Sequence, residues 1–171
     1  MKLTWFAGST IRIHIAGRIL VADPAGIRGV DAGELVSGAD VTFFIDEAGD
    51  AVDPALWQPR RVAAMIDAEA VPDVLVHGVE GGALVAAAGE PPLVLLKGPM
   101  GAAGRWARDA VIVVFGDEAD VVAGRVLDEV GPHLIAIAAP DAVIERAVAA
   151  LRDRVGETLL VALEPGMALE V

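Results

Sequence analysis

An alternation of apolar and polar residues near the start of the chain constrains the fold more than any other feature. Over residues 10–15 the order Thr-Ile-Arg-Ile-His-Ile places three isoleucines on one face of an extended strand and leaves Arg12 and His14 on the other. Ala16-Gly17 is typical of a tight hairpin turn, and residues 18–23 predict a second strand. We therefore expect the chain to begin with an antiparallel β-meander.

The rest of the sequence mixes strands with helices. Short apolar runs predict further strands at residues 40–45, 74–77, 93–96, 111–115, 134–138 and 158–163. Apolar spacing of a helical kind is found at residues 59–68, 118–130 and 141–155, and residues 78–82 are interpreted as a strand-to-helix turn. Because helices must cover the apolar faces of the sheets, this order predicts an α+β fold in layers. A length of 171 residues without a repeat or a long linker favours one domain, residues 1–171.

Composition limits the core and the partners. Hydrophobic residues make up 55% of the chain and aromatic residues only 4%, so the core must consist mainly of Ala, Val, Leu and Ile. The mean hydropathy of +0.58 is high for a soluble monomer, and we expect apolar surface to be buried in a homo-oligomer. The formal charge of −12 disfavours nucleic acid as a partner.

The absence of cysteine excludes disulfides, thiolate nucleophiles and thiolate metal sites. No apolar run approaches the roughly 20 residues that a membrane-spanning helix needs. We therefore expect a cytoplasmic protein that does not contact a membrane. The abundance of Ala, Val and Arg is common in bacterial proteins with GC-rich genes.

Several short motifs along the chain resemble the metallo-β-lactamase superfamily. They are residues 1–5 followed by Gly8-Ser9-Thr10, then residues 21–24, 40–41, 53–54, 113–117 and 163–169. Within the superfamily they are most similar to the lactonase-like branch of metal-dependent hydrolases, which includes the ascorbate-phosphate lactonases. The resemblance implies a four-layer αβ/βα sandwich, with two mixed sheets face to face and helices outside.

The same resemblance places the metal-binding loop of the family at residues 46–51. In the family, a His-x-His-x-Asp-His loop helps to hold one or two divalent ions, which lower the pKa of a bound water toward neutrality. Here Asp46 takes the position of the first histidine, and Asp50 keeps the aspartate of the family. Ala48 and Ala51 replace the other two histidines. Alanine offers no ligand atom, so the resemblance implies a degenerate zinc site.

Other motifs of the family are kept only in part. Asp117 matches the family's aspartate that bridges two metal ions. The Gly-His-Ser of the family is replaced by residues 7–9, Ala-Gly-Ser. Residues 97–108 form only a short connection without the usual histidine, and the final histidine of the family is missing from residues 134–163. The chain therefore resembles a shortened member whose metal-binding histidines are missing.

Two interpretations of the surviving carboxylates remain open. Asp46, Asp50 and Asp117 could converge in an all-oxygen site for Mg²⁺, Mn²⁺ or Ca²⁺, which are cations that prefer carboxylates. Glu47 or Asp120 would then add a ligand. Alternatively, Asp50 and Asp117 stabilise the turn or the helix N-terminus that follows each of them.

Among the three histidines, His77 is the one expected beside a pocket, because it ends a predicted strand where a loop begins. His14 and His133 are interpreted as surface or hydrogen-bonded residues. The glycine-rich segment 97–105 matches neither a P-loop nor a dinucleotide-binding motif and is expected to be a short crossover. The two serines of the chain lie outside any nucleophile-elbow pattern, which disfavours serine hydrolysis.

The sequence therefore supports two functions. The first is a pseudoenzyme without a cofactor, which keeps the scaffold for oligomerisation or for binding a protein or small-molecule partner. The alternative is a metal-dependent hydrolase of an ester, lactone or phosphoester, with a divalent cation held by Asp46, Asp50 and Asp117. A metal ion bound by these carboxylates would favour the alternative.

Overall fold

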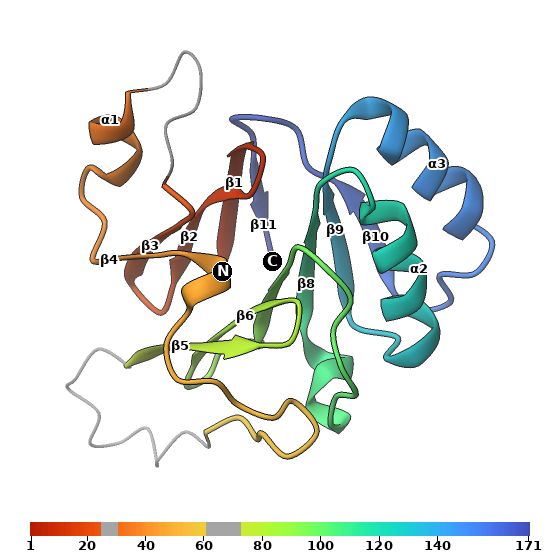
Figure 1. Ribbon diagram of the computed structural model, residues 1–171, viewed down its shortest axis with the longest axis horizontal. Coiled ribbons are helices and arrows are strands. Elements are labelled where there is room, and N and C mark those ends of the chain that lie inside the picture. Colours follow the sequence, from red (N-terminus) through yellow and green to blue (C-terminus); the bar gives the residue numbers. More distant parts are fainter. Residues whose placement is uncertain (25–30, 61–72) are drawn as a thin grey trace.

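The computed structural model describes residues 1–24, 31–60 and 73–171, and within them the strands form two sheets (Figure 1). The five-stranded sheet comprises, in spatial order, β11 (Ala168–Glu170), β1 (Lys2–Ala7), β2 (Thr10–Ile15), β3 (Arg18–Ala22) and β4 (Val41–Phe43). The six-stranded sheet comprises β10 (Leu159–Ala162), β9 (Leu134–Ala138), β8 (Val111–Phe115), β7 (Leu93–Leu96), β6 (Gly82–Ala87) and β5 (Val74–Val79). The helical elements are α1 (Ala32–Val36), η1 (Ile45–Glu47), η2 (Arg105–Asp109), α2 (Ala119–Glu129) and α3 (Asp141–Leu151), where η marks a 3-10 helix.

Both sheets are mixed. In the five-stranded sheet, β11, β1, β2 and β3 pair antiparallel and only β4 joins parallel to β3. In the six-stranded sheet, β5, β6 and β7 pair antiparallel, whereas β7 to β10 pair parallel. The predicted opening meander is confirmed, and so is the α+β fold class with two mixed sheets.

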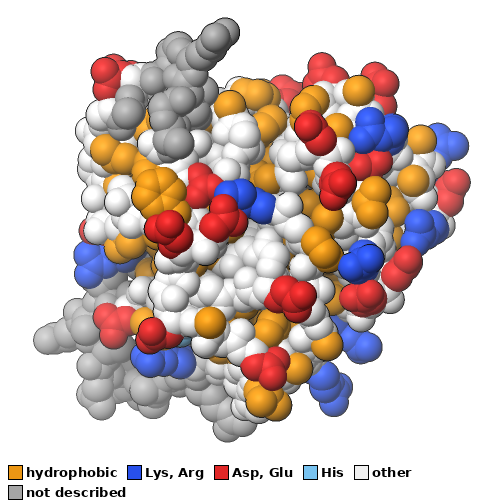
Figure 2. Space-filling model, viewed as in Figure 1, with side chains coloured by type: hydrophobic (Ala, Val, Ile, Leu, Met, Phe, Trp, Pro, Cys, Tyr) orange, Lys and Arg blue, Asp and Glu red, His pale blue; other side chains and the backbone are white. Residues whose placement is uncertain are grey.

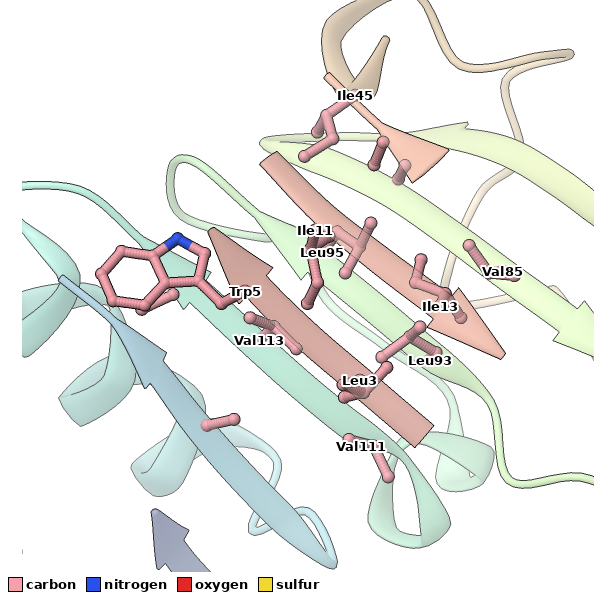
Figure 3. Packing of buried hydrophobic residues seen from close by; sticks show 14 of the residues in the cluster. Leu3, Trp5, Ile11, Ile13, Ile45, Val85, Leu93, Leu95, Val111 and Val113 are labelled. Carbon is pink, nitrogen blue, oxygen red and sulfur yellow. The ribbon is translucent and has the colours of Figure 1, made fainter. Parts of the chain in front are cut away.

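The main core lies between the two sheets. Ile11, Ile13 and Leu3 project from the five-stranded sheet and are fully buried, and Figure 3 shows them beside Leu95 and Val113 of the six-stranded sheet. Burial of one such aliphatic side chain stabilises the fold by about 1.5–3 kcal/mol. The isoleucines of the alternating segment 10–15 therefore pack the five-stranded sheet against the six-stranded sheet.

A second core covers the other face of the six-stranded sheet. Val94, Ile112 and Ile135 point away from the first core and pack with apolar residues of α2 and α3. The strands β7, β8 and β9 are thus buried on both faces, which explains why they consist of continuous apolar runs instead of alternating residues. Figure 1 shows α2 and α3 side by side on this outer face.

The outer face of the five-stranded sheet carries α1 in the described residues. Asp31 caps this helix through the backbone N–H groups of Gly33 and Glu34. Arg12 donates hydrogen bonds to the carbonyl oxygens of Leu35 (3.2 Å) and Ser37 (2.9 Å), so the polar face of β2 holds the helix end. None of the helices in the described segments is long and apolar enough to cross a membrane.

The prediction for residues 78–82 is wrong. The chain continues as β5 to Val79, turns at Glu80-Gly81 and returns antiparallel as β6, so this segment is a β-hairpin and does not lead into a helix. The sequence of β6, Gly-Ala-Leu-Val-Ala-Ala, has few β-branched residues and was therefore missed. A Cβ atom at Gly82 would lie 1.9 Å from the carbonyl oxygen of Leu95, so only glycine allows β6 to approach β7 here.

Three other predictions need adjustment. The strand predicted at 40–45 is limited to residues 41–43, and it is an exposed edge strand in which Val41 is 40% exposed. The helix predicted at 141–155 ends at Leu151. The helix predicted at 59–68 lies outside the described residues from position 61 onward, and residues 59–60 are not helical.

The hairpin turn between β2 and β3 provides a test of local backbone strain. Ala16 (φ 48°) and Gly17 (φ 76°) both adopt the left-handed conformation that a type I′ turn requires. Asparagine tolerates this conformation better than alanine, so Ala16→Asn should raise the free energy of unfolding by about 0.5–1 kcal/mol. Gly17→Ala should lower it by about 1 kcal/mol, although a Cβ atom at Gly17 has no neighbour within 4 Å. Urea unfolding of both variants measures these changes, and equal stability of all three proteins would contradict the argument.

Candidate functional site

Three loop regions surround a hollow of about 690 Å³ at one edge of the sandwich. Its lining consists of residues 45–49 around η1, residues 51–52, residues 78–82 of the β5–β6 hairpin and residues 97–98 after β7. Figure 2 shows charged side chains of both signs around a central, mostly white surface, where backbone is exposed on this face of the molecule.

Glycines let the loop after η1 lie directly against β5. A Cβ atom at Gly49 would be 2.2 Å from the carbonyl oxygen of Val76, and one at Gly78 would be 2.8 Å from that of Ala48. Gly78 accepts a hydrogen bond from the N–H of Val52 (2.9 Å) and forms a parallel bridge with Ala51. Residues 46–51, which resemble the metal-binding loop of the family, are therefore held in place by backbone pairing to β5.

A buried aspartate fixes the position of η1 beside the hollow. Asp23 follows β3 with a left-handed backbone (φ 45°), and only 7% of its surface is exposed. Its Oδ1 accepts the backbone N–H of Ile45 at 2.8 Å, and its Oδ2 accepts the hydroxyl of Ser9 at 2.5 Å. The hydroxyl of Thr10 donates to its backbone carbonyl oxygen at 2.6 Å. These contacts bind the end of β3 to β2 and to η1.

Lys97 brings a positive charge to the same place from the other sheet. Its Nζ lies 3.3 Å from Oδ2 of Asp23 and forms an ion pair with Oδ2 of Asp46. Partial burial alone would lower the pKa of Lys97, but its hydrogen bonds and attraction to Asp46 and Asp23 outweigh this effect and raise that pKa above its ordinary value. The ammonium group therefore stays charged at neutral pH.

The structure separates the three carboxylates that were predicted as metal ligands. Asp46 lines the hollow, together with Glu47. Asp50 is exposed and uses its backbone carbonyl oxygen to accept the N–H of Gly78. Asp117 is exposed in the turn after β8, where its carbonyl oxygen accepts a hydrogen bond from Arg146. In residues 1–24, 31–60 and 73–171 there is no group of three or more His, Cys, Asp or Glu placed to hold a metal ion.

The alternative role of Asp117 as a cap of the following helix is not seen. The residue that precedes α2 as its N-cap is Glu118, whose side chain makes no capping hydrogen bond, and Asp117 lies one position before it. Asp120, the possible additional ligand, pairs with Arg146 at 2.9 Å. The hydrogen bond from Arg146 lowers the pKa of Asp120, so this carboxylate is engaged between α2 and α3.

The histidines lie in three different settings. His77 is half-buried on β5 and lines a separate cavity on the outer face of the six-stranded sheet. His14 is half-buried on β2, where burial, followed by the charges of Arg12 and Lys2, lowers its pKa. His133 is exposed before β9. The glycine-rich segment after Lys97 leads through η2 to β8, which is parallel to β7, so it is the short crossover that was predicted.

Sequence reasoning missed Asp23 and Lys97 as site residues. Asp23 was visible only as the end of a strand before a proline, and Lys97 only as the residue before a glycine-rich loop. One signal was available, because Lys97 is one of only two lysines in the chain. Their proximity depends on how the two sheets face each other, which no local pattern encodes.

Comparison with known proteins supports the fold. The chain matches no protein-family model, and a search of curated proteins found no match. Among solved structures, it is similar to Igni18, a metallo hydrolase from the hyperthermophilic archaeon Ignicoccus hospitalis KIN4/I, with a TM-score of 0.54 and 12% sequence identity. The match covers 99% of this chain and 98% of that chain. The protein therefore has a metallo-hydrolase-like fold, a distant likeness that extends over nearly its whole length.

The residues at the hollow do not fit a divalent cation. Catalytic metal sites combine several imidazole or carboxylate ligands around one ion. Here Asp46 and Glu47 are the acidic residues of the loop that face the hollow, whereas Ala48 and Ala51 offer no side-chain ligand. The ammonium group of Lys97 already forms ion pairs with Asp46 and Asp23. Lys97 therefore supplies, from the chain itself, a positive charge beside these carboxylates.

The two carboxylates beside Lys97 should differ strongly in their effect on stability. Asp23→Asn leaves the buried partners of Asp23 with an amide that cannot accept all their hydrogen bonds, so we expect a loss of about 3 kcal/mol in the free energy of unfolding. Asp46→Asn should change it by less than about 0.5 kcal/mol, because the side chain of Asp46 is 68% exposed. Urea unfolding at neutral pH measures both values. A larger loss for Asp46→Asn than for Asp23→Asn would contradict the assignment.

Proposed function

We propose that this chain is a non-catalytic protein on a metallo-hydrolase-like fold, which binds a small molecule or a protein partner at the hollow beside Lys97. The observation that carries the proposal is the position of the Lys97 ammonium group between Asp23 and Asp46. It provides the positive charge that these carboxylates need. A hydrolase of this class would instead use a metal ion to activate water.

The positive charge of Lys97 disfavours the binding of a metal ion in the hollow. A divalent cation placed beside Asp46 would also lie close to the charged Lys97, and like charges in a partly buried site repel strongly. Removing Lys97 from the site would leave Asp23, whose side chain is only 10% exposed, without its neutralising partner. Metal binding would therefore work against the contacts that hold the site together.

The lining of the hollow supports a binding site with charged groups of both signs. Asp46, Glu47 and Glu80 line it together with Lys97. A volume of about 690 Å³ is within the range of small-molecule sites. Homo-oligomerisation and a cytoplasmic location remain predictions from the sequence.

Hydrolysis of an ester, lactone or phosphoester is the second candidate function. The likeness to Igni18 supports it, because that protein is described as a metallo hydrolase. In this alternative, Asp46, Asp50 and Asp117 would hold a divalent cation such as Mg²⁺, Mn²⁺ or Ca²⁺. The two functions make opposite predictions about bound metal.

Metal analysis of the purified protein distinguishes the two functions. After dialysis against Zn²⁺, Mn²⁺ or Mg²⁺ and removal of excess ions, the protein should retain no stoichiometric metal. A variant with Asp46→Asn, Asp50→Asn and Asp117→Asn should give the same result, because these carboxylates form no metal site in our account. Stoichiometric metal in the natural protein that is lost in the variant would establish the carboxylate-bound cation and overturn the proposal.

A further inference from the structure

The outer face of the β5–β6 hairpin carries a cavity that is separate from the hollow at Lys97. Leu75 and His77 of β5 line it together with Ala86 of β6, and its volume is about 310 Å³. Val74 and Val76 point the other way, into the core between the sheets. The cavity thus lies on the opposite face of the same strands, beyond the area that α2 and α3 cover.

One wall of this cavity is held in place by a tryptophan pair. Trp57 lines the cavity, and its ring lies edge-on to that of Trp106 with 4.8 Å between the ring centroids. The indole N–H of Trp106 donates to the carbonyl oxygen of Pro54 at 2.8 Å, and the backbone N–H of Trp57 donates to the carbonyl oxygen of Asp53 at 2.9 Å. Such fixed aromatic walls reduce the ordering cost of binding an apolar molecule.

His77 brings to this site a polar atom that has no hydrogen-bond partner among the described residues. Its Nδ1 atom is buried and makes no hydrogen bond within the described part of the chain. Leaving a buried polar atom unpaired destabilises a protein, and such atoms are rare in folded proteins. A ligand that hydrogen-bonds to the imidazole would recover part of this cost.

The charged residues at the rim favour an uncharged ligand. Arg60 and Asp73 have opposite charges. Glu90 is already engaged, since its Oε2 lies 3.5 Å from the amino group of Met1 and its Oε1 accepts the N–H of Ala16 at 3.4 Å. Among the described residues that line the cavity, no net charge is left to attract an ion. The volume is at the lower end of the range of small-molecule sites.

We infer that this cavity, which is floored by the β5–β6 hairpin and walled by Trp57, binds a small uncharged aromatic molecule that donates a hydrogen bond to His77. The ligand's apolar body packs on Leu75 and Ala86, and its donor pairs with the imidazole. This site is independent of the proposed function at Lys97, so either can fail alone.

Titration with indole tests the inference on the whole chain. Indole provides an aromatic body with one N–H donor, and indene is its hydrocarbon counterpart without the donor. We expect saturable shifts of backbone amide NMR signals confined to residues 75–77, 86–88 and the neighbourhood of Trp57. Indole should bind about fivefold more tightly than indene, which corresponds to one net hydrogen bond. Shifts that do not saturate, or that lie elsewhere, would overturn the inference.

Three variants separate the apolar and polar contributions. Ala86→Leu fills the cavity and should weaken indole binding by at least about tenfold, whereas Ala149→Leu, at an exposed position on α3, should leave it unchanged. His77→Phe should abolish the preference for indole over indene. If Ala86→Leu unfolds the protein, Ala88→Leu replaces it as the filling variant. Equal affinity for indole and indene in the natural protein would remove His77 from the site.

Discussion

The buried carboxylate of Asp23 is the interaction on which this edge of the sandwich depends. It stands at the end of β3 and accepts hydrogen bonds from Ser9 before β2 and from the backbone of Ile45 in η1. It also meets Lys97, which follows β7 in the other sheet. One residue therefore connects three segments of the five-stranded sheet region with the six-stranded sheet. The position of the loop that lines the hollow follows from these contacts.

The chemistry of this edge differs from what a metallo-hydrolase-like fold suggests. A metal ion needs several ligands around it, and the loop after η1 offers alanine at two of the positions that resemble metal ligands. The chain instead places a lysine among carboxylates, and their attraction keeps the lysine charged. A fold does not fix a function, because function depends on the residues of the site. In our proposal, the same architecture serves binding instead of hydrolysis.

The parts of the fold that follow from local pattern could be predicted from the sequence. The alternation over residues 10–15 gave the inward face of β2, and continuous apolar runs gave β7, β8 and β9, because burial on one or two faces leaves a clear signature. β6 escaped prediction, since its alanines and glycine have low strand propensity and tertiary packing decides its structure.

The candidate site was less predictable for a physical reason. Asp46 was identified as a residue of the site, and it does line the hollow. Asp50 follows η1 and Asp117 follows β8, and sequence spacing alone gave no information on whether their carboxylates would meet. The pairing of Asp23 with Lys97 spans 74 positions of the chain and depends on how the two sheets pack. The sequence around either residue therefore does not predict this contact.

A double-mutant cycle on Asp23 and Lys97 tests the central claim most directly. The free energy of unfolding would be measured by urea for the natural protein, Asp23→Asn, Lys97→Met and the double variant. If the lysine serves as the internal cation of the site, the two changes are coupled by about 1 kcal/mol or more, with the double variant less unstable than the sum of the single changes. Additive effects of the two substitutions would contradict the account, because they would show that Lys97 does not neutralise Asp23.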